Sequence, residues 1–106
     1  MDAASKISPE EALALLEREP AARLIDVRPA VAYLGGHIPG AKSLPIVQLA
    51  AAAVSALPDQ TAPVVAYCQT GQQSPKACQI LADLGYQEVY DLGGVESWPY
   101  PLQGGL

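Results

Sequence analysis

Residues 64–75 place a cysteine between a buried strand and a helix, and this stretch constrains the fold most. It reads Val-Val-Ala-Tyr-Cys-Gln-Thr-Gly-Gln-Gln-Ser-Pro. The apolar, β-branched run over 64–68 is typical of a buried strand. Ser74 and Pro75 are typical of a helix N-cap and first helical residue, because proline has no N–H to lose there. The pattern therefore predicts strand, loop and helix in succession, with Cys68 at the carboxyl end of the strand.

The loop after Cys68 is suited to hold an anion. Open α/β sheets keep their sites at the carboxyl ends of strands, and free backbone N–H groups at a helix start favour negative charge. Gly71 allows the backbone to curl where a side chain would be strained. A thiolate is an anion, so the amides of residues 69–74 are expected to favour the thiolate form of Cys68, the candidate nucleophile.

The rest of the chain alternates between strand and helix patterns. Ser8-Pro9-Glu10-Glu11 has the residues of a capping box, and Gly93-Gly94 is expected to end the last strand. The expected elements are a short strand at 6–7, a helix from 9 to about 19, a strand over 23–28, a turn over 30–34, a brief strand over 42–44, a helix over 46–56, the strand over 64–68, a helix from 75 to about 84, a strand over 88–92 and a turn over 95–98. Such alternation predicts an α/β fold with a parallel sheet and helices on both faces.

Composition excludes several classes of protein. The chain has 106 residues, of which half are hydrophobic and 16% charged, so it is long enough for one globular domain with its own core. Its net charge of −5 argues against a nucleic-acid partner, which would need clustered lysine and arginine. No apolar run approaches 18 residues, so no membrane span is expected, and the first ten residues lack the apolar segment of a signal peptide.

The two cysteines are expected to remain thiols. There is no CxxC motif and His37 is the only histidine, so neither a metal site nor a cofactor is predicted. A disulfide between Cys68 and Cys78 is possible on paper. However, Cys78 lies between core-facing positions of its helix, which favours a packing role. Two free thiols indicate a reducing compartment, and we expect a cytoplasmic protein.

Four segments carry a resemblance to a known family. The segments are Leu24-Ile25-Asp26-Val27-Arg28, Gly36-His37-Ile38-Pro39-Gly40-Ala41, the loop Tyr67 to Ser74, and Leu84-Gly85-Tyr86 with Val89-Tyr90, Gly93-Gly94 and Trp98. Together, and in this order, they resemble single-domain sulfurtransferases of the rhodanese homology family. The resemblance implies a three-layer rhodanese-like fold with a five-stranded, mostly parallel sheet flanked by helices. It also implies one domain over 1–106, with a core from about 7 to 98 and a tail over 99–106.

The resemblance further implies the activity and its residues. Cys68 would attack the outer sulfur of thiosulfate or another persulfide donor, keep that sulfur as a persulfide, and pass it to cyanide or a thiol. His37, in a Gly-Pro turn, is expected to be a hydrogen-bonding support, as are Asp26 and Arg28, which tie loops together. The implied substrate-binding residues are Gln69, Thr70, Gly71, Gln72, Gln73 and Ser74.

The loop departs from the family pattern in its charge. Sulfur-transferring members often carry a basic residue just after the cysteine and arginine at the fifth position after it, where this chain has Gln69 and Gln73. Charge-assisted hydrogen bonds are about twice as strong as neutral ones. Losing one should cost about 1–3 kcal/mol per contact with a dianion, so we predict a high Michaelis constant for thiosulfate. Lys76, the nearest cation in sequence, could partly substitute, although a solvated surface lysine is the better interpretation.

Two other functions fit parts of the pattern. A non-catalytic binding or regulatory module of the same fold would explain the missing arginines. A phosphatase or arsenate reductase would need arginine at the sixth position after the cysteine, where this chain has Ser74. Tyr33 and Tyr67 are expected at the mouth of the site.

Overall fold

The computed structural model describes residues 4–105; the ends of the predicted domain, residues 1–3 and 106, lie outside that range. A five-stranded sheet forms the middle layer, in the order β1-β5-β4-β2-β3, and all four pairings are parallel. The strands are β1 (Ser5–Lys6), β2 (Arg23–Asp26), β3 (Lys42–Ser43), β4 (Val64–Cys68) and β5 (Val89–Gly94). This confirms the predicted α/β fold, with the cysteine-bearing strand at the centre of the sheet.

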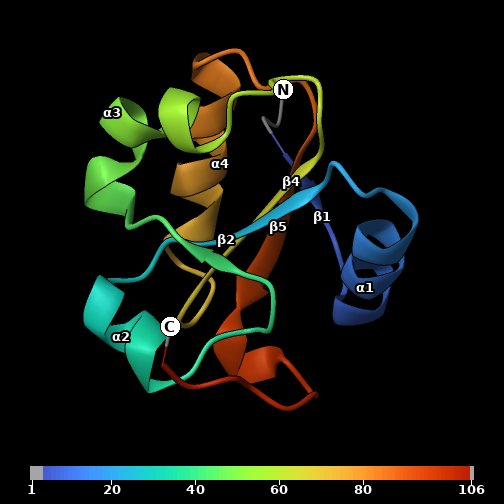
Figure 1. Ribbon diagram of the computed structural model, residues 1–106, viewed down its shortest axis with the longest axis vertical. Coiled ribbons are helices and arrows are strands. Elements are labelled where there is room, and N and C mark those ends of the chain that lie inside the picture. Colours follow the sequence, from blue (N-terminus) through green and yellow to red (C-terminus); the bar gives the residue numbers. More distant parts are fainter. Residues whose placement is uncertain (1–3, 106) are drawn as a thin grey trace.

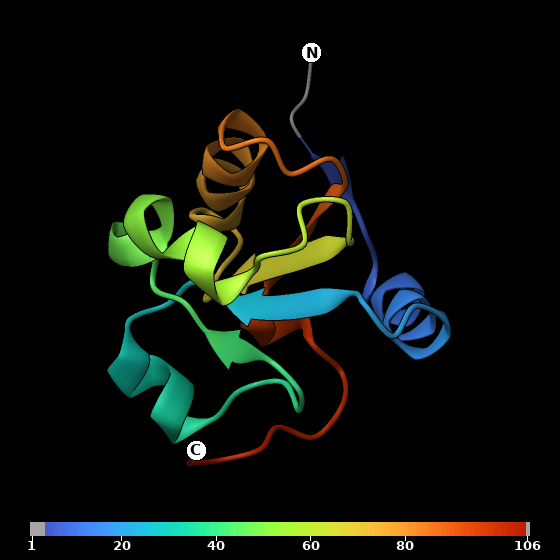
Figure 2. The ribbon, with the colours of Figure 1, turned by 45° about the horizontal axis from the view of Figure 1, so that its top comes forward.

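Helices cover both faces of the sheet. Helix α1 lies on one side, and α3 and α4 lie together on the other (Figures 1 and 2). The helices are α1 (Pro9–Arg18), α2 (Ala30–Gly35), α3 (Ile46–Ala56) and α4 (Ser74–Asp83), followed by a 3-10 turn, η1 (Val95–Ser97). Among residues 4–105, no helix has the length and apolar character needed to cross a bilayer.

Local sequence accounts for the helix boundaries. The Ser8 hydroxyl accepts from the Glu11 amide, while the Glu11 carboxylate accepts from the Ser8 amide, so the predicted capping box is present. Gly85 follows α4 with φ of +105°, as a C′ glycine should. These features explain why most helices begin and end close to the predicted residues.

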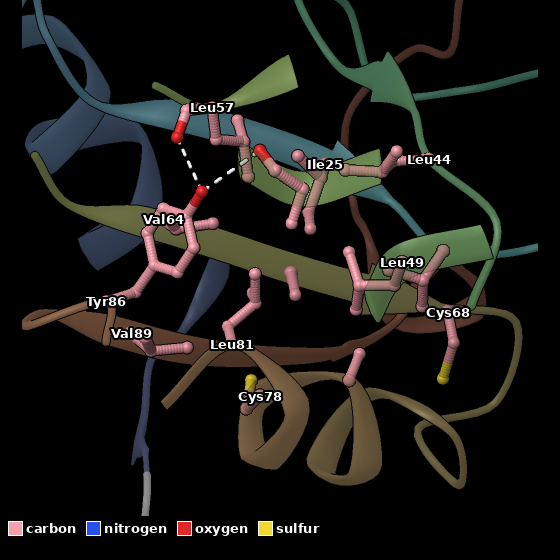
Figure 3. Packing of buried hydrophobic residues seen from close by; sticks show 14 residues of the cluster. Ile25, Leu44, Leu49, Leu57, Val64, Cys68, Cys78, Leu81, Tyr86 and Val89 are labelled. Atoms are coloured by element: carbon pink, nitrogen blue, oxygen red, sulfur yellow. Dashed lines mark hydrogen bonds between the residues drawn. The ribbon is translucent and has the colours of Figure 1, made fainter. Parts of the chain in front are cut away.

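Strand β4 sends its side chains alternately into two cores. Cys68 points to the α3–α4 face, together with Val64 and Ala66, whereas Val65 and Tyr67 point to the α1 face. Every residue of β4 is buried because layers cover both faces. Figure 3 shows the α3–α4 core, including Ile25, Leu49, Leu57, Leu81, Tyr86 and Val89. The same alternation that fills the core therefore determines on which side of the sheet the cysteine sulfur lies.

The glycine pair does not end β5, which corrects the sequence prediction. Strand β5 runs on to Gly94, with a bulge that shifts the pairing from Ala66–Asp91 to Tyr67–Gly93. Gly93 takes φ of +89°, which a residue with a side chain would adopt only under strain. The glycines thus extend the pairing with β4 as far as Cys68.

Candidate active site

The sulfur of Cys68 lies in a cradle of backbone amides. The amide of Gly71 is 3.1 Å from Cys68 Sγ and the amide of Ser74 is 3.3 Å away, and both donate to it. Cys68 itself is buried at the end of β4. Cys68 therefore lies beneath loop amides, as predicted, with one donor in the middle of the loop and the other at the first residue of α4.

Gly71 is glycine because of its backbone conformation. Its φ is +97°, and a Cβ added there would meet only ordinary contacts, the nearest being 3.5 Å from the Gly94 nitrogen. Space is therefore available, but the left-handed conformation that turns this amide towards Cys68 is costly for other residues.

Ser74 is not the N-cap of α4, which corrects the prediction. It is the first residue of the helix, Gln73 is the N-cap, and no side chain caps the helix. The Ser74 hydroxyl is fully buried and donates to Asp91 Oδ1 at 2.6 Å. Because the hydroxyl is bound by a carboxylate, the residue contributes to the cradle through its amide instead.

Asp91 was not predicted as part of the site. It lies in β5 and is 6% exposed. A signal was present in the sequence: an acidic residue inside an otherwise apolar strand is seldom buried unless it is paired. The identity of its partner, Ser74, depends on how α4 packs against β5.

The side chain of Gln69 is held on both sides. Its Oε1 accepts from Arg28 Nη1 at 3.0 Å, and its Nε2 donates to Glu96 Oε2 at 3.1 Å. The Glu96 amide also donates to the Gln69 carbonyl. Gln69 thus links the segment after β2 to η1, and Glu96 is a further residue that the sequence did not indicate.

The other three polar residues of the loop face outwards. Thr70, Gln72 and Gln73 are exposed, and their side chains form no hydrogen bond with any residue between 4 and 105. Their hydroxyl and amide groups are therefore free to meet a bound molecule.

The pair of Asp26 and Arg28 joins three parts of the chain. Arg28 Nη2 lies 2.7 Å from Asp26 Oδ2, and both side chains are buried. The same guanidinium donates to Gln69 and, at 2.7 Å, to the Gly36 carbonyl. Its hydrogen bonds to Asp26 raise the pKa of Arg28 above its ordinary value, so the arginine stays charged.

His37 is buried away from the loop's sulfur-binding amides. Its Nδ1 is 2.8 Å from the Tyr33 carbonyl, its ring stacks on Tyr33 at 3.7 Å, and its backbone pairs with Gln103. These contacts tie the segment after α2 to the end of the chain.

Tyr67 does not line the mouth of the site, contrary to the prediction. It is fully buried on the α1 face, and its hydroxyl accepts from the Ile38 amide at 3.1 Å. Burial raises the pKa of Tyr67. Strand alternation is the reason: the residue next to Cys68 must point to the opposite face. The Tyr33 hydroxyl donates to the Ala41 carbonyl.

A groove opens beside the loop on the α3–α4 side. It has a volume of about 520 Å³, and its polar lining consists of Arg28, Gln69, Gln73 and Lys76. Apolar lining comes from the segment after β2, from α3 and from α4, through residues that include Val27, Ile46 and Ile80. Two of the loop glutamines therefore border a space large enough for a small organic molecule.

Cys78 is a packing residue, as predicted. It is fully buried on α4, and its thiol lies 3.6 Å from the Tyr90 carbonyl. Burial, reinforced by the charge of Asp91, raises the pKa of the Cys78 thiol to about 12. Figure 3 shows its sulfur well apart from that of Cys68, and both cysteines are free thiols.

Comparison with known proteins identifies the family. The model of the rhodanese-like domain matches residues 8–99. Thiosulfate sulfurtransferase GlpE of Pseudomonas fluorescens (strain SBW25) is 39% identical over 101 residues, covering 92% of this chain and 89% of the relative. Thiosulfate sulfurtransferase PspE of Escherichia coli (strain K12) is 36% identical over 77 residues, covering 73% of this chain and 74% of the relative.

Solved structures agree with the sequence matches. The human single-domain sulfurtransferase TSTD1 superposes with a TM-score of 0.78 at 30% identity, over 90% of this chain and 95% of that one. A rhodanese from E. coli solved with anions gives a TM-score of 0.74 at 33% identity, over 79% of this chain and 99% of that one. The chain belongs to the rhodanese-like domain family.

Proposed function

We propose that this chain is a thiosulfate sulfurtransferase-like enzyme that carries sulfane sulfur as a persulfide on Cys68. The observation that carries the proposal is the pair of backbone amides, from Gly71 and Ser74, that donate to Cys68 Sγ. Hydrogen bonds of this kind favour a thiolate over a thiol, and the thiolate is the nucleophilic form. Relatives named thiosulfate sulfurtransferases support the same reaction.

In the first step the Cys68 thiolate attacks the outer sulfur of thiosulfate. A new sulfur–sulfur bond forms at Cys68, the bond inside thiosulfate breaks, and sulfite leaves with the electron pair. Charge balances, since a thiolate and a dianion become a persulfide anion and a dianion. The amides that hold Sγ keep the attacking atom in place, and the exposed hydroxyl and amide groups of Thr70, Gln72 and Gln73 are the substrate-binding groups.

In the second step an acceptor removes the outer sulfur. A thiolate, or cyanide, attacks it, the persulfide bond breaks, and Cys68 is released as a thiolate ready for another cycle. No external oxidant or reductant is required. The groove beside Gln69 and Gln73 is the place for the organic part of a thiol acceptor, or of a thiol-bound persulfide donor.

The uncharged loop argues for weak binding of thiosulfate. No side chain from Gln69 to Ser74 is charged, and the Arg28 guanidinium is already bound to Asp26. The dianion would therefore be held by neutral donors, which bind about half as strongly as charged ones. We infer that a thiol-bound persulfide competes well with thiosulfate as donor, in a reducing, cytoplasmic setting.

Mass spectrometry of the intact protein tests the proposal. After incubation with thiosulfate, or with a small organic persulfide, wild type should gain one sulfur atom that cyanide removes. The Cys68→Ser variant should gain none, and Cys78→Ser, the matched control, should load as wild type does. Absence of an adduct with every donor would overturn the proposal and favour a binding module of the same fold, which the uncharged loop also fits.

A further inference from the structure

We infer that Asp91 is a positioning residue for the sulfur of Cys68. One of its carboxylate oxygens holds the structural units that carry both amide donors, one on α4 and the other in the loop. The inference rests on the proposed function, because it concerns the reactivity of Cys68 as a sulfur carrier. The Asp91 carboxylate makes three contacts that support this inference.

The first contact fixes the start of α4. Asp91 Oδ1 accepts the hydroxyl hydrogen of Ser74 at 2.6 Å, and both side chains are buried. Ser74 is also the residue whose amide donates to Cys68 Sγ at 3.3 Å. Helix α4 has no side-chain cap, and this hydroxyl attaches the side chain of its first residue to β5. Through it, Asp91 determines where the Ser74 amide points.

The second contact fixes the surface on which Gly71 rests. The same Oδ1 accepts from the Gly93 amide at 2.9 Å, at the bulge of β5. The next residue, Gly94, packs so closely on the loop that a Cβ there would lie 2.7 Å from the Gln69 carbonyl oxygen. Gly71 also lies against Gly94, since a Cβ on Gly71 would make an ordinary contact with the Gly94 nitrogen at 3.5 Å. The bulge held by Asp91 therefore supports the loop that carries the Gly71 amide.

The third contact of the carboxylate is an ion pair with Lys6, and it is the weakest of the three. Asp91 is 6% exposed, and a buried charge is costly unless it is hydrogen-bonded and paired. Oδ1 has its two donors, and Oδ2 lies 3.5 Å from Lys6 Nζ. Lys6 is 87% exposed, so this ion pair is screened by solvent and contributes little. The hydrogen bonds at Oδ1, more than the charge, are the important feature.

Four variants test the inference. Asp91→Ala removes the acceptor, Ser74→Ala removes the donor, and Asp91→Asn keeps an acceptor oxygen without the charge. Tyr86→Phe is the control, since it removes a buried hydroxyl that donates to the Ala53 and Leu57 carbonyls, far along the same core (Figure 3). The readouts are the rate of Cys68 alkylation by iodoacetamide at pH 7, the rate of sulfur loading, and the midpoint of thermal unfolding.

The expected result separates positioning from stability. Alkylation and sulfur loading should both slow by about three- to tenfold in Asp91→Ala and Ser74→Ala, because the amides of Gly71 and Ser74 remain but are no longer held in position against the sulfur. Asp91→Asn should stay within about twofold of wild type, since an amide oxygen can accept the same bonds. Tyr86→Phe should lower the unfolding midpoint and leave the reactivity of Cys68 unchanged.

Two outcomes would overturn the inference. One is that folded Asp91→Ala and Ser74→Ala react as fast as wild type; the other is that Tyr86→Phe slows alkylation as much as they do. If Asp91→Ala does not fold, Ser74→Ala decides, because it removes only one hydroxyl and leaves the amide. Failure of wild type to load sulfur would instead count against the proposed function, while the alkylation rates would still test positioning.

Discussion

At the scale of single residues, the sulfur of Cys68 is held by backbone amides and not by charged side chains of the loop. Gly71 and Ser74 present amides to the sulfur, and the exposed loop side chains are neutral. Such a site can stabilise a thiolate without attracting a dianion strongly. Its nucleophile and its affinity for thiosulfate can therefore be altered separately.

Replacing Gln73 by arginine should improve the binding of thiosulfate. Gln73 is exposed at the end of the loop and borders the groove, so a guanidinium there can reach an anion near Cys68. We expect the Michaelis constant for thiosulfate to fall about three- to tenfold, because the new hydrogen bonds are charge-assisted but partly screened. Steady-state kinetics with cyanide as acceptor measures this.

The control for this change is Gln87→Arg. It adds the same charge at an exposed position just before β5, at the opposite end of that strand from the loop. Its Michaelis constant should equal that of wild type. An unchanged Michaelis constant in Gln73→Arg, or an equal fall of this constant in both variants, would show that the loop does not determine affinity for thiosulfate.

The buried thiol of Cys78 should make stability depend on alkaline pH. Its pKa is about 12 in the folded protein against an ordinary value of 9.0. Between these values the unfolded chain has lost a proton that the folded chain keeps, so stability falls as pH rises, by up to about 1.4 kcal/mol per pH unit. Below pH 9 both states are protonated and this contribution is constant.

Urea unfolding of wild type and Cys78→Ala at pH 7 and pH 10.5 measures the effect. The variant should start less stable, because it loses buried atoms, but it should lose less stability on going to pH 10.5. Tyrosines titrate in both proteins, so the comparison between the two isolates Cys78. Equal losses would mean that the thiol is accessible in the folded protein.

At the scale of elements, the end of β5 packs directly against the backbone of the loop. Gly94 pairs with Cys68 across the sheet, and its Cα faces the Gln69 and Thr70 backbone. Backbone against backbone leaves no flexible side chain to move aside. The loop and the strand end should therefore shift together.

Gly94→Ala should displace the loop and slow the chemistry of Cys68. The new Cβ would lie 2.6 Å from the Thr70 carbonyl carbon, closer than real contacts allow. We expect a loss of about 1–3 kcal/mol in stability from overpacking, with slower alkylation of Cys68. Gly35→Ala is the control, since nothing lies within 4 Å of a Cβ there. Normal alkylation of Cys68 in Gly94→Ala would contradict this coupling.

At the scale of the whole molecule, one buried ion pair connects separate layers. Arg28 reaches Asp26 at the end of β2, the Gly36 carbonyl after α2, and Gln69 in the loop. Gln69 in turn contacts Glu96 in η1. This network connects the carboxyl end of the sheet to the segments that surround it.

Asp26→Ala should destabilise the whole domain strongly. It leaves the buried Arg28 without its counter-charge, and breaking a buried pair in this way costs about 3–5 kcal/mol. Lys6→Ala offers the contrast: it removes the exposed member of a solvent-screened pair with Asp91 and should change stability by less than about 1 kcal/mol. Urea unfolding compares the two, and a small loss in Asp26→Ala would show that Arg28 finds other partners.

The sequence by itself determined the order of the elements and the position of the nucleophile. Contacts between residues close in sequence determine strand β4 before Cys68, the capping box at Ser8 and the bounds of α3. A local sequence pattern is enough to predict such features. The family resemblance then predicted that the loop binds sulfur. These conclusions needed no knowledge of how the layers pack.

Only the tertiary structure decided which polar groups surround the sulfur. Ser74 and Asp91 are 17 residues apart, and Gln69 and Glu96 are 27 apart. Such partners depend on the bulge in β5 and on how α4 packs against that strand, since each connection in a parallel sheet passes through a crossover. For the same reason Gly93-Gly94 was mistaken for a strand end: a glycine pair signals a break along the chain, but in the sheet it lets β5 approach the loop that holds Cys68.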